Sequence, residues 1–357
     1  MPGVEGGVLF PADKLRAFTV AVFEKVGVSP EDAAVVTDSL IEANLRGVDT
    51  HGITRMLCVY IKRLQVGVMS PRTEWSIARE NASTALIDAK NSLGQVVATR
   101  AMQLAISKAK QTGIGFTAVN HANHYGAAAY YSMMALEHDM IGFSSTNAPA
   151  GVAPWGGRQP ILGTNPFSYA LPAGEEEPVV LDMATTVVAR GRLLLYAKQN
   201  LPLEPGWALD ERGVPTTDPQ TALRGILAPL GGYKGYGLAL IVDLLCGVMT
   251  GANYGGHFPG FLADNLEEPS DIGSVFMAIN VNSFMDTAEF KGRMDQAVRE
   301  IKGSALAEGA TRIYVPGEIE FETKAERLAH GIPVPEQVVK DFVALGQELA
   351  VPFPRLD

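Results

Sequence analysis

Apolar residues recur at helical spacing through the first 65 positions of the chain. The apolar positions of the first predicted helix are Leu15, Phe18, Val22 and Val26. Ser29-Pro30-Glu31-Asp32 combines a hydroxyl cap, an early proline and acidic residues, which predicts a second helix that ends at Gly47. A third helix, with Thr50 as its cap, is expected to end at Gly67. The amino-terminal segment is therefore predicted to be helical.

From about Thr84 onward, short apolar runs alternate with longer helical patterns. Strands are expected near residues 116–119, 141–145, 167–171, 179–181, 274–281 and 313–315. Helices are expected near residues 92–111, 127–137, 187–199, 236–249, 288–308 and 336–349. This alternation predicts an α/β (α+β) fold with a central sheet domain over residues 79–318, carrying a helical insertion near 187–270. Residues 1–78 and 319–357 are expected to form a helical domain from both chain ends.

The composition excludes several classes of protein. Of 357 residues, 47% are hydrophobic and 19% are charged, which excludes a disordered or collagen-like chain. The net charge of −10 disfavours nucleic acid and anionic membranes as partners. Cys58 and Cys246 are too few for a disulfide framework, so buried free thiols are expected. The first residues, Met1 to Glu5, have no signal-peptide character, and a cytoplasmic protein is expected.

One glycine-rich segment imitates a dinucleotide-binding fingerprint. Gly113-Ile114-Gly115-Phe116-Thr117-Ala118 matches G-x-G-x-x-G/A. The fingerprint works only where it leaves a strand and opens a helix, because the helix N-terminus must face the pyrophosphate. Here a predicted helix precedes the segment and a predicted strand follows it. A turn is therefore expected rather than a Rossmann site.

Thr50-His51-Gly52-Ile53-Thr54-Arg55 is the first candidate for catalysis. The spacing places His51 and Arg55 on one face of a helix start, where the helix dipole lowers the pKa of a histidine. Arginine binds carboxylates in a bidentate fork, and histidine exchanges protons near neutral pH. The pair suits a substrate with an acid group beside a reacting oxygen, and Asp49 could orient the imidazole. The structural alternative is a helix-capping histidine beside a surface ion pair.

His121-Ala122-Asn123-His124-Tyr125-Gly126 lies between a predicted strand and a predicted helix, where α/β proteins place ligands. A substrate-contacting His124 is one reading, and a structural histidine is another. The spacing of His121 and His124 also permits a metal-dependent hydrolase, with His138 as the nearest further ligand. Without an acidic companion, this spacing is weak evidence for a metal, and no metal site is assigned.

Three further segments carry candidate binding residues. Asp182 ends a strand in the segment Leu181-Asp182-Met183-Ala184-Thr185-Thr186, where small residues follow, so it could hold a ribose hydroxyl or cap the next helix. Tyr233 and Lys234 lie in a glycine-dense turn before an apolar helix, where an anion site or a plain turn is expected. Other polar or turn-forming candidates are Asn147, Gly317 and Glu318.

The ordered set of these segments resembles the type 2 malate/L-lactate dehydrogenase family. The segments that carry the resemblance are 50–55, 123–126, 162–172, 181–192, 230–245, 316–318 and 326–333, and they span almost the whole chain. This family binds NAD or NADP without a Rossmann fold, and its members are typically homodimers. It includes malate, lactate, sulfolactate and ureidoglycolate dehydrogenases, together with cyclic-imine reductases.

The resemblance implies a reaction and a set of site residues. It implies hydride transfer between a nicotinamide cofactor and a small 2-hydroxy or 2-oxo acid, with a cyclic-imine carboxylate as the alternative substrate. Arg55 would hold the carboxylate, and either His51 or His124 would exchange the proton. The residues implied along the cofactor are Asn147, Asp182, Met183, Ala184, Tyr233, Lys234, Gly317 and Glu318. The sequence departs from the family at Thr50, often serine, and at Tyr233, often histidine.

Overall fold

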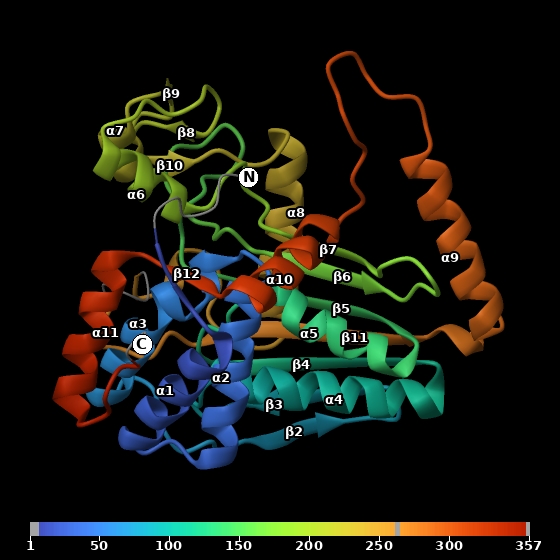
Figure 1. The fold of residues 1–357 in the computed structure, drawn as a ribbon, viewed down its shortest axis with the longest axis horizontal. Coiled ribbons are helices and arrows are strands. Elements are labelled where there is room, and N and C mark those ends of the chain that lie inside the picture. Colours follow the sequence, from blue (N-terminus) through green and yellow to red (C-terminus); the bar gives the residue numbers. More distant parts are fainter. Residues whose placement is uncertain (1–6, 261–264, 355–357) are drawn as a thin grey trace.

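The computed structural model of the protein describes residues 7–260 and 265–354 (Figure 1). Its helices are α1 (Ala12–Lys25), α2 (Pro30–Leu45), α3 (Ile53–Gln65), α4 (Gly94–Thr112), α5 (Ala128–Met134), α6 (Arg190–Gln199), α7 (Pro219–Arg224), α8 (Tyr233–Asp243), α9 (Thr287–Lys302), α10 (Glu318–His330) and α11 (Glu336–Leu349). Its strands are β1 (Val8–Phe10), β2 (Ser76–Glu80), β3 (Thr84–Asp88), β4 (Ile114–Ala122), β5 (Met140–Thr146), β6 (Phe167–Leu171), β7 (Val179–Met183), β8 (Ala208–Leu209), β9 (Pro215–Thr216), β10 (Ile226–Leu227), β11 (Ile272–Asn280) and β12 (Ile332–Val334).

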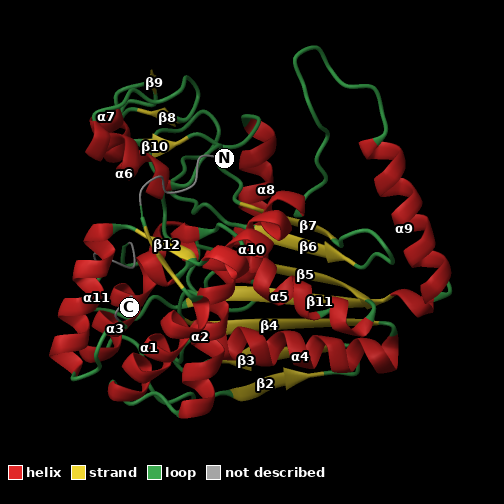
Figure 2. Cartoon of the chain, in the orientation of Figure 1, coloured by secondary structure: helices red, strands yellow, loops and turns green. Residues whose placement is uncertain are grey.

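A mixed sheet lies at the centre of the molecule, with the strand order β2-β3-β4-β11-β5-β6-β7 (Figure 2). The β3–β4 pair is parallel, and the other neighbours are antiparallel. Alternate residues of a strand face opposite sides of the sheet. Val119 and Phe276 accordingly pack with α4 and α5, whereas Ala118 and Val275 pack with Val242 and Cys246 near the end of α8. Helices therefore cover both faces, and the expected mixed α/β fold is confirmed.

Both ends of the chain contribute to one hydrophobic core beside this sheet. It joins apolar faces of α1, α2, α3 and α11 with the short β1–β12 pair. Phe18, Phe342 and Phe353 contact one another there, with ring centroids 4.9–5.9 Å apart. This core joins α2 to α3, and α10 packs against α2 and β12; residues from the starts of α3 and α10 belong to the site described below.

A smaller unit lies between β7 and α8 along the chain. It comprises α6, α7 and the three-stranded sheet β10-β8-β9, which form a separate cluster of helices and strands in Figure 1. Trp207 and Leu193 are buried in its own hydrophobic cluster, which also includes Val152 and Leu162 from the preceding loop. The unit thus packs against the loop that follows β5.

The structure confirms some of the sequence predictions in detail and corrects others. The Ser29 hydroxyl accepts the Asp32 N–H at 3.2 Å, so the predicted cap of α2 is confirmed. The expected cap of α3 is wrong: Gly52 occupies that position, and Thr50 lies in a 3₁₀ turn, Asp49–His51. The helix expected near 288–308 is shorter than predicted. It ends at Lys302, and residues 303–317 form a long connection to α10.

Three further differences concern the carboxyl-terminal half. Residues 313–315 are not a strand, since only the Pro316 carbonyl bonds to β7, through Val180 N–H at 2.9 Å. Helix α8 begins at Tyr233, one turn earlier than expected, and continues into a π-helical turn, Leu244–Val248. Helix α10 was not predicted. Among the described residues, no helix is long and apolar enough to span a membrane; Met1 to Glu5 lie outside those residues.

The segment that imitates a dinucleotide fingerprint turns at Gly113 and then enters β4, so the prediction that it is not a Rossmann site is confirmed. Helix α4 ends before Gly113, which has a φ of +85°, and β4 follows it. A Cβ at Gly115 would collide with the backbone of Ala105, so this glycine permits close packing of strand against helix. The segment offers no helix N-terminus to a pyrophosphate.

Candidate active site

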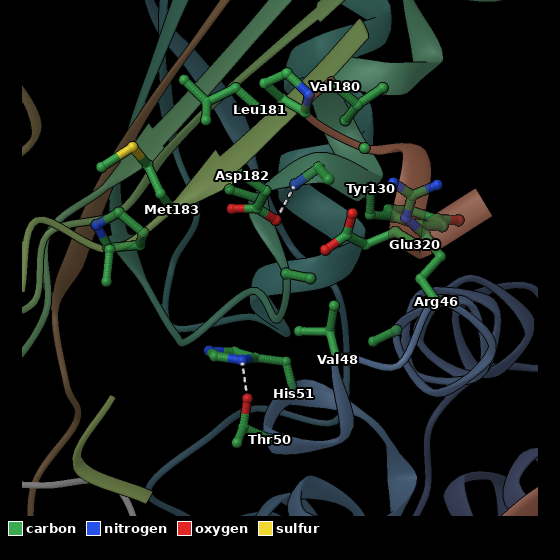
Figure 3. A pocket seen from close by; sticks show the side chains of 18 of the residues that line it. Arg46, Val48, Thr50, His51, Tyr130, Val180, Leu181, Asp182, Met183 and Glu320 are labelled. Atoms are coloured by element: carbon green, nitrogen blue, oxygen red, sulfur yellow. Dashed lines mark hydrogen bonds between the residues drawn. The ribbon is translucent and has the colours of Figure 1, made fainter. Parts of the chain in front are cut away.

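A cavity of about 520 Å³ lies where α2, α5, β7 and the start of α10 meet (Figure 3). The residues singled out in the sequence that line it are His51, Asp182, Met183, Ala184 and Gly317. Charged residues that sequence reasoning missed also line it: Glu42, Arg46 and Glu320. The cavity therefore joins segments from the first, middle and last thirds of the chain.

The turn Asp49–His51 brings His51 into this cavity. Asp49 does not orient the imidazole, as the sequence had suggested, because its carboxylate binds Arg327 and the Asn44 amide instead. The Thr50 hydroxyl lies 2.9 Å from His51 Nδ1 and takes that role. Gly52 follows directly, and a Cβ there would collide with the Asn44 side chain. The turn is thus held by Asn44 from one side and Arg327 from the other.

His51 is neutral in this environment. Burial lowers the pKa of His51 to about 4, and the nearby positive charge of Arg55 lowers it further in the same direction. Desolvation disfavours the charged form of an imidazole, so the ring is unprotonated near pH 7. A neutral imidazole lining a cavity can accept a proton from a bound hydroxyl group.

Arg55 lies one helical turn after His51 and projects toward the start of α6. A Cβ at Gly191 would collide with the Arg55 guanidinium, which shows how closely the two segments approach. Within the described part of the chain, Arg55 has no hydrogen bond or ion pair. Burial lowers the pKa of Arg55, yet its guanidinium stays charged at neutral pH. An unpaired guanidinium beside an imidazole is suited to binding a carboxylate.

His124 lies next to His51, although 73 positions separate them in the sequence. The two rings are stacked, with centroids 5.6 Å apart and an interplanar angle of 17°. His124 Nδ1 lies 2.6 Å from the Tyr60 hydroxyl and 3.3 Å from the Gly126 backbone nitrogen. Burial, followed by the charges of His51 and Arg55, lowers the pKa of His124 to about 3. The structure therefore brings together His51, Arg55 and His124.

Asp182 ends β7 on the opposite wall of the cavity. One of its oxygens accepts the Ala129 N–H at 2.8 Å (Figure 3). Burial raises the pKa of Asp182 to about 6, while the Ala129 bond and the charge of Arg46 act against that rise. Figure 3 shows the Glu320 carboxylate on the facing side of the cavity, beside Arg46. Oxygen acceptors from two chain segments are thus available to the hydroxyl groups of a ligand.

Gly317 explains how α10 approaches β7. Its φ of +95° is accessible mainly to glycine, and a Cβ there would contact Val180 at 2.9 Å. The Pro316–Gly317 segment therefore runs against the edge strand without a side chain between them. Met183 ends β7, and Ala184 follows it along the same wall. The small residues Gly317 and Ala184 leave room for a ligand close to the backbone.

Six of the sequence candidates lie outside the cavity lining, and two of these, Arg55 and His124, lie beside His51. Asn147 uses its amide to join Asn253 and Gly273, at 2.7 and 3.1 Å. Tyr233 and Lys234 are exposed at the start of α8, where the Tyr233 ring meets Trp155 edge to face. Glu318 forms ion pairs with Lys302 and Arg312. Glu320, two positions further on, lines the cavity instead.

His121 and His124 do not converge on one point. His121 Nδ1 lies 3.1 Å from the Asp88 carboxylate, whereas His124 is bound to Tyr60. His138 belongs to the separate turn Leu136–His138. In residues 7–260 and 265–354, no group of three histidine, cysteine, aspartate or glutamate side chains could hold a metal ion. The metal-dependent hydrolase reading has no support from this geometry.

Known proteins resemble this chain over nearly its full length. The chain is 41% identical to a malate dehydrogenase of Pyrococcus abyssi, over 97% of this chain and 96% of that protein. It is 44% identical to an L-sulfolactate dehydrogenase of Methanocaldococcus jannaschii, over 87% of this chain and 89% of that protein. An NAD(+)-dependent ureidoglycolate dehydrogenase of Escherichia coli is 32% identical, with 90% of each chain covered.

Solved structures agree with these sequence matches. The malate dehydrogenase of Entamoeba histolytica superposes with a TM-score of 0.93 at 35% identity, covering 98% of this chain and all of that one. A delta1-piperideine-2-carboxylate reductase of Pseudomonas syringae superposes with a TM-score of 0.84 at 27% identity, covering 95% and 99%. The model of the malate/L-lactate dehydrogenase family matches residues 10–343. The chain therefore belongs to the malate/L-lactate dehydrogenase family.

Proposed function

We propose that the protein is an NAD- or NADP-dependent oxidoreductase that interconverts a small 2-hydroxy acid and the corresponding 2-oxo acid. The observation that carries this proposal is the guanidinium of Arg55, which has no hydrogen bond or ion pair among the described residues, beside the neutral imidazole of His51. Arg55 would bind the substrate carboxylate, and His51 would exchange a proton with the adjacent oxygen. The names of the relatives, malate and sulfolactate dehydrogenases, describe acids of this class.

The walls of the cavity fit a nicotinamide nucleotide. Its volume of about 520 Å³ lies within the usual range of ligand pockets. Asp182 and Glu320 offer carboxylate oxygens to ribose hydroxyls, and Gly317 lets the backbone approach closely. The bound cofactor would accept or donate the hydride at C2 of the substrate. Lys234, at the N-terminus of α8, and Tyr233 would contact the more distant part of the cofactor.

The proton follows a simple route in this proposal. When a 2-hydroxy acid is oxidised, its hydroxyl proton passes to the neutral His51 as the hydride leaves C2. In the reverse direction, the protonated His51 returns that proton to the carbonyl oxygen. The substrate carboxylate on Arg55 offsets the positive charge that disfavours imidazolium, so substrate binding would raise the pKa of His51 from about 4. General acid–base catalysis of this kind contributes about 10²–10⁴ in rate.

The test is the oxidation of NADH and NADPH by the purified protein with a panel of acceptors. Oxaloacetate, pyruvate and sulfopyruvate represent 2-oxo acids that differ in side-chain charge. Turnover of one of them with one cofactor supports the proposal and identifies both reactants. Absence of turnover with every 2-oxo acid in the panel, at concentrations up to several millimolar, contradicts it.

A second candidate keeps the same site but changes the substrate to a cyclic-imine carboxylate. The fold match to the piperideine-carboxylate reductase favours it, and Arg55 would bind the carboxylate in the same way. The panel therefore includes such an imine. Turnover of the imine alone, without any 2-oxo acid, would select this candidate.

A homodimer is the expected form of the enzyme. The outward side of α8 and the following π-helical turn exposes a row of large apolar side chains, namely Leu238, Ile241, Leu244, Val248 and Met249. Contiguous apolar surface of this kind is typical of protein–protein contacts. Sedimentation equilibrium of the purified protein would give a mass of two chains, and a monomeric mass at micromolar concentration would contradict this expectation.

A further inference from the structure

The Nδ1 atom of His124 receives hydrogen bonds from two separate donors. The backbone N–H of Gly126 points to it from 3.3 Å, and this group can only donate. An atom that accepts from Gly126 N–H carries no proton of its own. The Tyr60 hydroxyl, 2.6 Å from the same Nδ1, must therefore donate as well. The remaining ring proton of the neutral imidazole lies on Nε2.

The surroundings of Tyr60 keep it in the donor role. The side chain is 1% exposed, and its ring packs in the core formed by both chain ends. Burial raises the pKa of Tyr60 well above its usual value, so the hydroxyl retains its proton. The backbone geometry at Gly126, with a φ of +85°, holds the second donor in place. Tyr60 thus belongs to the hydrophobic core, whereas Gly126 lies in the lining of the cavity.

We propose, building on the proposed function, that Tyr60 and the Gly126 backbone lock His124 as the Nε2–H tautomer. His124 then acts as a hydrogen-bond donor toward the substrate, and His51 alone exchanges the proton. Tyr60 is a positioning residue, because it acts through His124. This division of roles resolves a choice that residue types could not settle, since both histidines are neutral and lie side by side.

The hydrogen bonds of His124 also determine whether its ring can take up a proton. With Nδ1 already accepting two bonds and Nε2 protonated, the His124 ring has no lone pair left for a proton. It can accept one only if the Tyr60 and Gly126 bonds are broken. A fixed N–H donor beside Arg55 would instead stabilise negative charge that develops on the substrate oxygen. The hydrogen bonding of His51 is different, because the partner of its Nδ1 within residues 7–260 and 265–354 is the Thr50 hydroxyl, which can donate or accept.

The first test reads the tautomer directly and needs no substrate. Nitrogen-15 spectra of the histidine side chains would be recorded for the wild type, Tyr60→Phe and Tyr131→Phe. His124 is expected to carry its proton on Nε2 in the wild type and to populate the Nδ1–H form in Tyr60→Phe. Tyr131→Phe is the matched control, because it removes another buried hydroxyl that binds the Tyr125 carbonyl. A wild-type proton on Nδ1 overturns the proposal, even if Tyr60→Phe fails to fold.

The second test uses the substrate found with the panel of acids. Tyr60→Phe is expected to lower kcat about tenfold with little change in KM, as the loss of one aligned hydrogen bond predicts. His124→Gln keeps an N–H donor and should retain more activity than His51→Gln. In the His124→Gln background, Tyr60→Phe should cost nothing further. An equal loss in both backgrounds, or a His124→Gln enzyme as inactive as His51→Gln, overturns the proposal.

Failure of this inference can be told apart from failure of the proposed function. If no 2-oxo acid or imine is turned over, the proposed function is wrong, while the nitrogen-15 spectra still decide the tautomer. If turnover is found but the spectra place the His124 proton on Nδ1, the function stands and the division of roles between the two histidines is wrong.

Discussion

The guanidinium of Arg327 contacts both carboxylate oxygens of Asp49, at 2.6 and 3.0 Å. Arg327 belongs to α10, whereas Asp49 begins the turn that carries His51. The same guanidinium also donates to the Asn44 carbonyl at the end of α2. A bidentate pair of this kind has a defined geometry as well as a charge. The carboxyl-terminal helix thus fixes the position of a proposed catalytic turn some 280 residues earlier in the chain.

Removing Arg327 should destabilise the protein. Arg327 is buried, so Arg327→Met leaves the Asp49 charge largely desolvated and unpaired, at a cost of about 3 kcal/mol in the free energy of unfolding. Urea unfolding followed by circular dichroism measures this cost. Arg299→Met is the control, because it breaks only solvent-screened surface pairs with Glu175 and Glu176 and should cost far less stability than Arg327→Met. Equal losses in both variants would show that the Asp49 pair has no special role.

Replacing His51 should abolish turnover without preventing cofactor binding. His51→Gln keeps a polar side chain of similar size but cannot exchange a proton, so kcat should fall about 10²–10⁴-fold. The dissociation constant of NADH or NADPH, measured from cofactor fluorescence, should change less than about threefold. A variant that loses cofactor binding together with turnover would show that His51 binds the cofactor and does not exchange a proton with the substrate.

The pH dependence of oxidation should show a low acidic limb. Oxidation of a 2-hydroxy acid needs His51 in its neutral form. In the free enzyme, burial lowers the pKa of His51 to about 4. The value of kcat/KM for oxidation should therefore stay level from pH 8 to about pH 5.5 and fall as the pH drops toward that pKa. A limb near pH 6.5, the ordinary value of a histidine, would show that the ring is hydrated in the working enzyme.

Arg55 should determine the affinity for the substrate carboxylate. Arg55→Gln removes the charge and the bidentate fork, so KM for the acid should rise at least about tenfold. Arg55→Lys keeps the charge without the fork and should give an intermediate KM. Arg192 is a suitable control position, because its guanidinium lies over the Trp207 ring in the neighbouring unit. An unchanged KM in Arg55→Gln would remove the carboxylate-binding role from this residue.

Local chemistry made several elements of the fold predictable. The Ser29 cap, the proline at the start of α2 and the apolar spacing of α11 are properties of short segments, and the predicted positions agree with the structure. Helix α10 escaped prediction because its start depends on Gly317 turning against β7, a contact between distant segments. The division of the chain into a helical and a sheet domain stays a prediction.

In the candidate site, too, contacts within a short segment were predictable and contacts between distant segments were not. His51 and Arg55 are four residues apart, so their proximity follows from one helical turn. The approach of His124 to His51 depends on how β4 and α3 pack, which residue spacing does not reveal. Glu318 was chosen from its motif, yet Glu320 faces the cavity, since two positions on a helix turn a side chain by more than half a circle. Arg46 gave no signal beyond its closeness to the Thr50–Arg55 segment.

Asp182 should reduce the stability of the unliganded protein at neutral pH. Its pKa is raised to about 6 from an unfolded value of 3.8, so the folded state binds more protons between these values. The destabilisation is therefore absent below about pH 4, grows as the pH rises through 6, and is complete above it. Asp182→Asn should raise the free energy of unfolding by about 1 kcal/mol or less at pH 8, because solvent screens a carboxylate that is more than a third exposed, and by little at pH 4.

The measurement is urea unfolding of wild type and Asp182→Asn at both pH values, without cofactor or substrate, because a bound ligand would add its own stabilisation. The buried histidines contribute a pH dependence of opposite sign, but they are common to both proteins and cancel in the difference. Asp210→Asn provides a control of opposite sign, since the Val214 backbone bond lowers the pKa of this carboxylate. It should destabilise the protein at pH 8. A difference for Asp182→Asn that is the same at both pH values would show that the effect comes from packing and that Asp182 is not a strained charge.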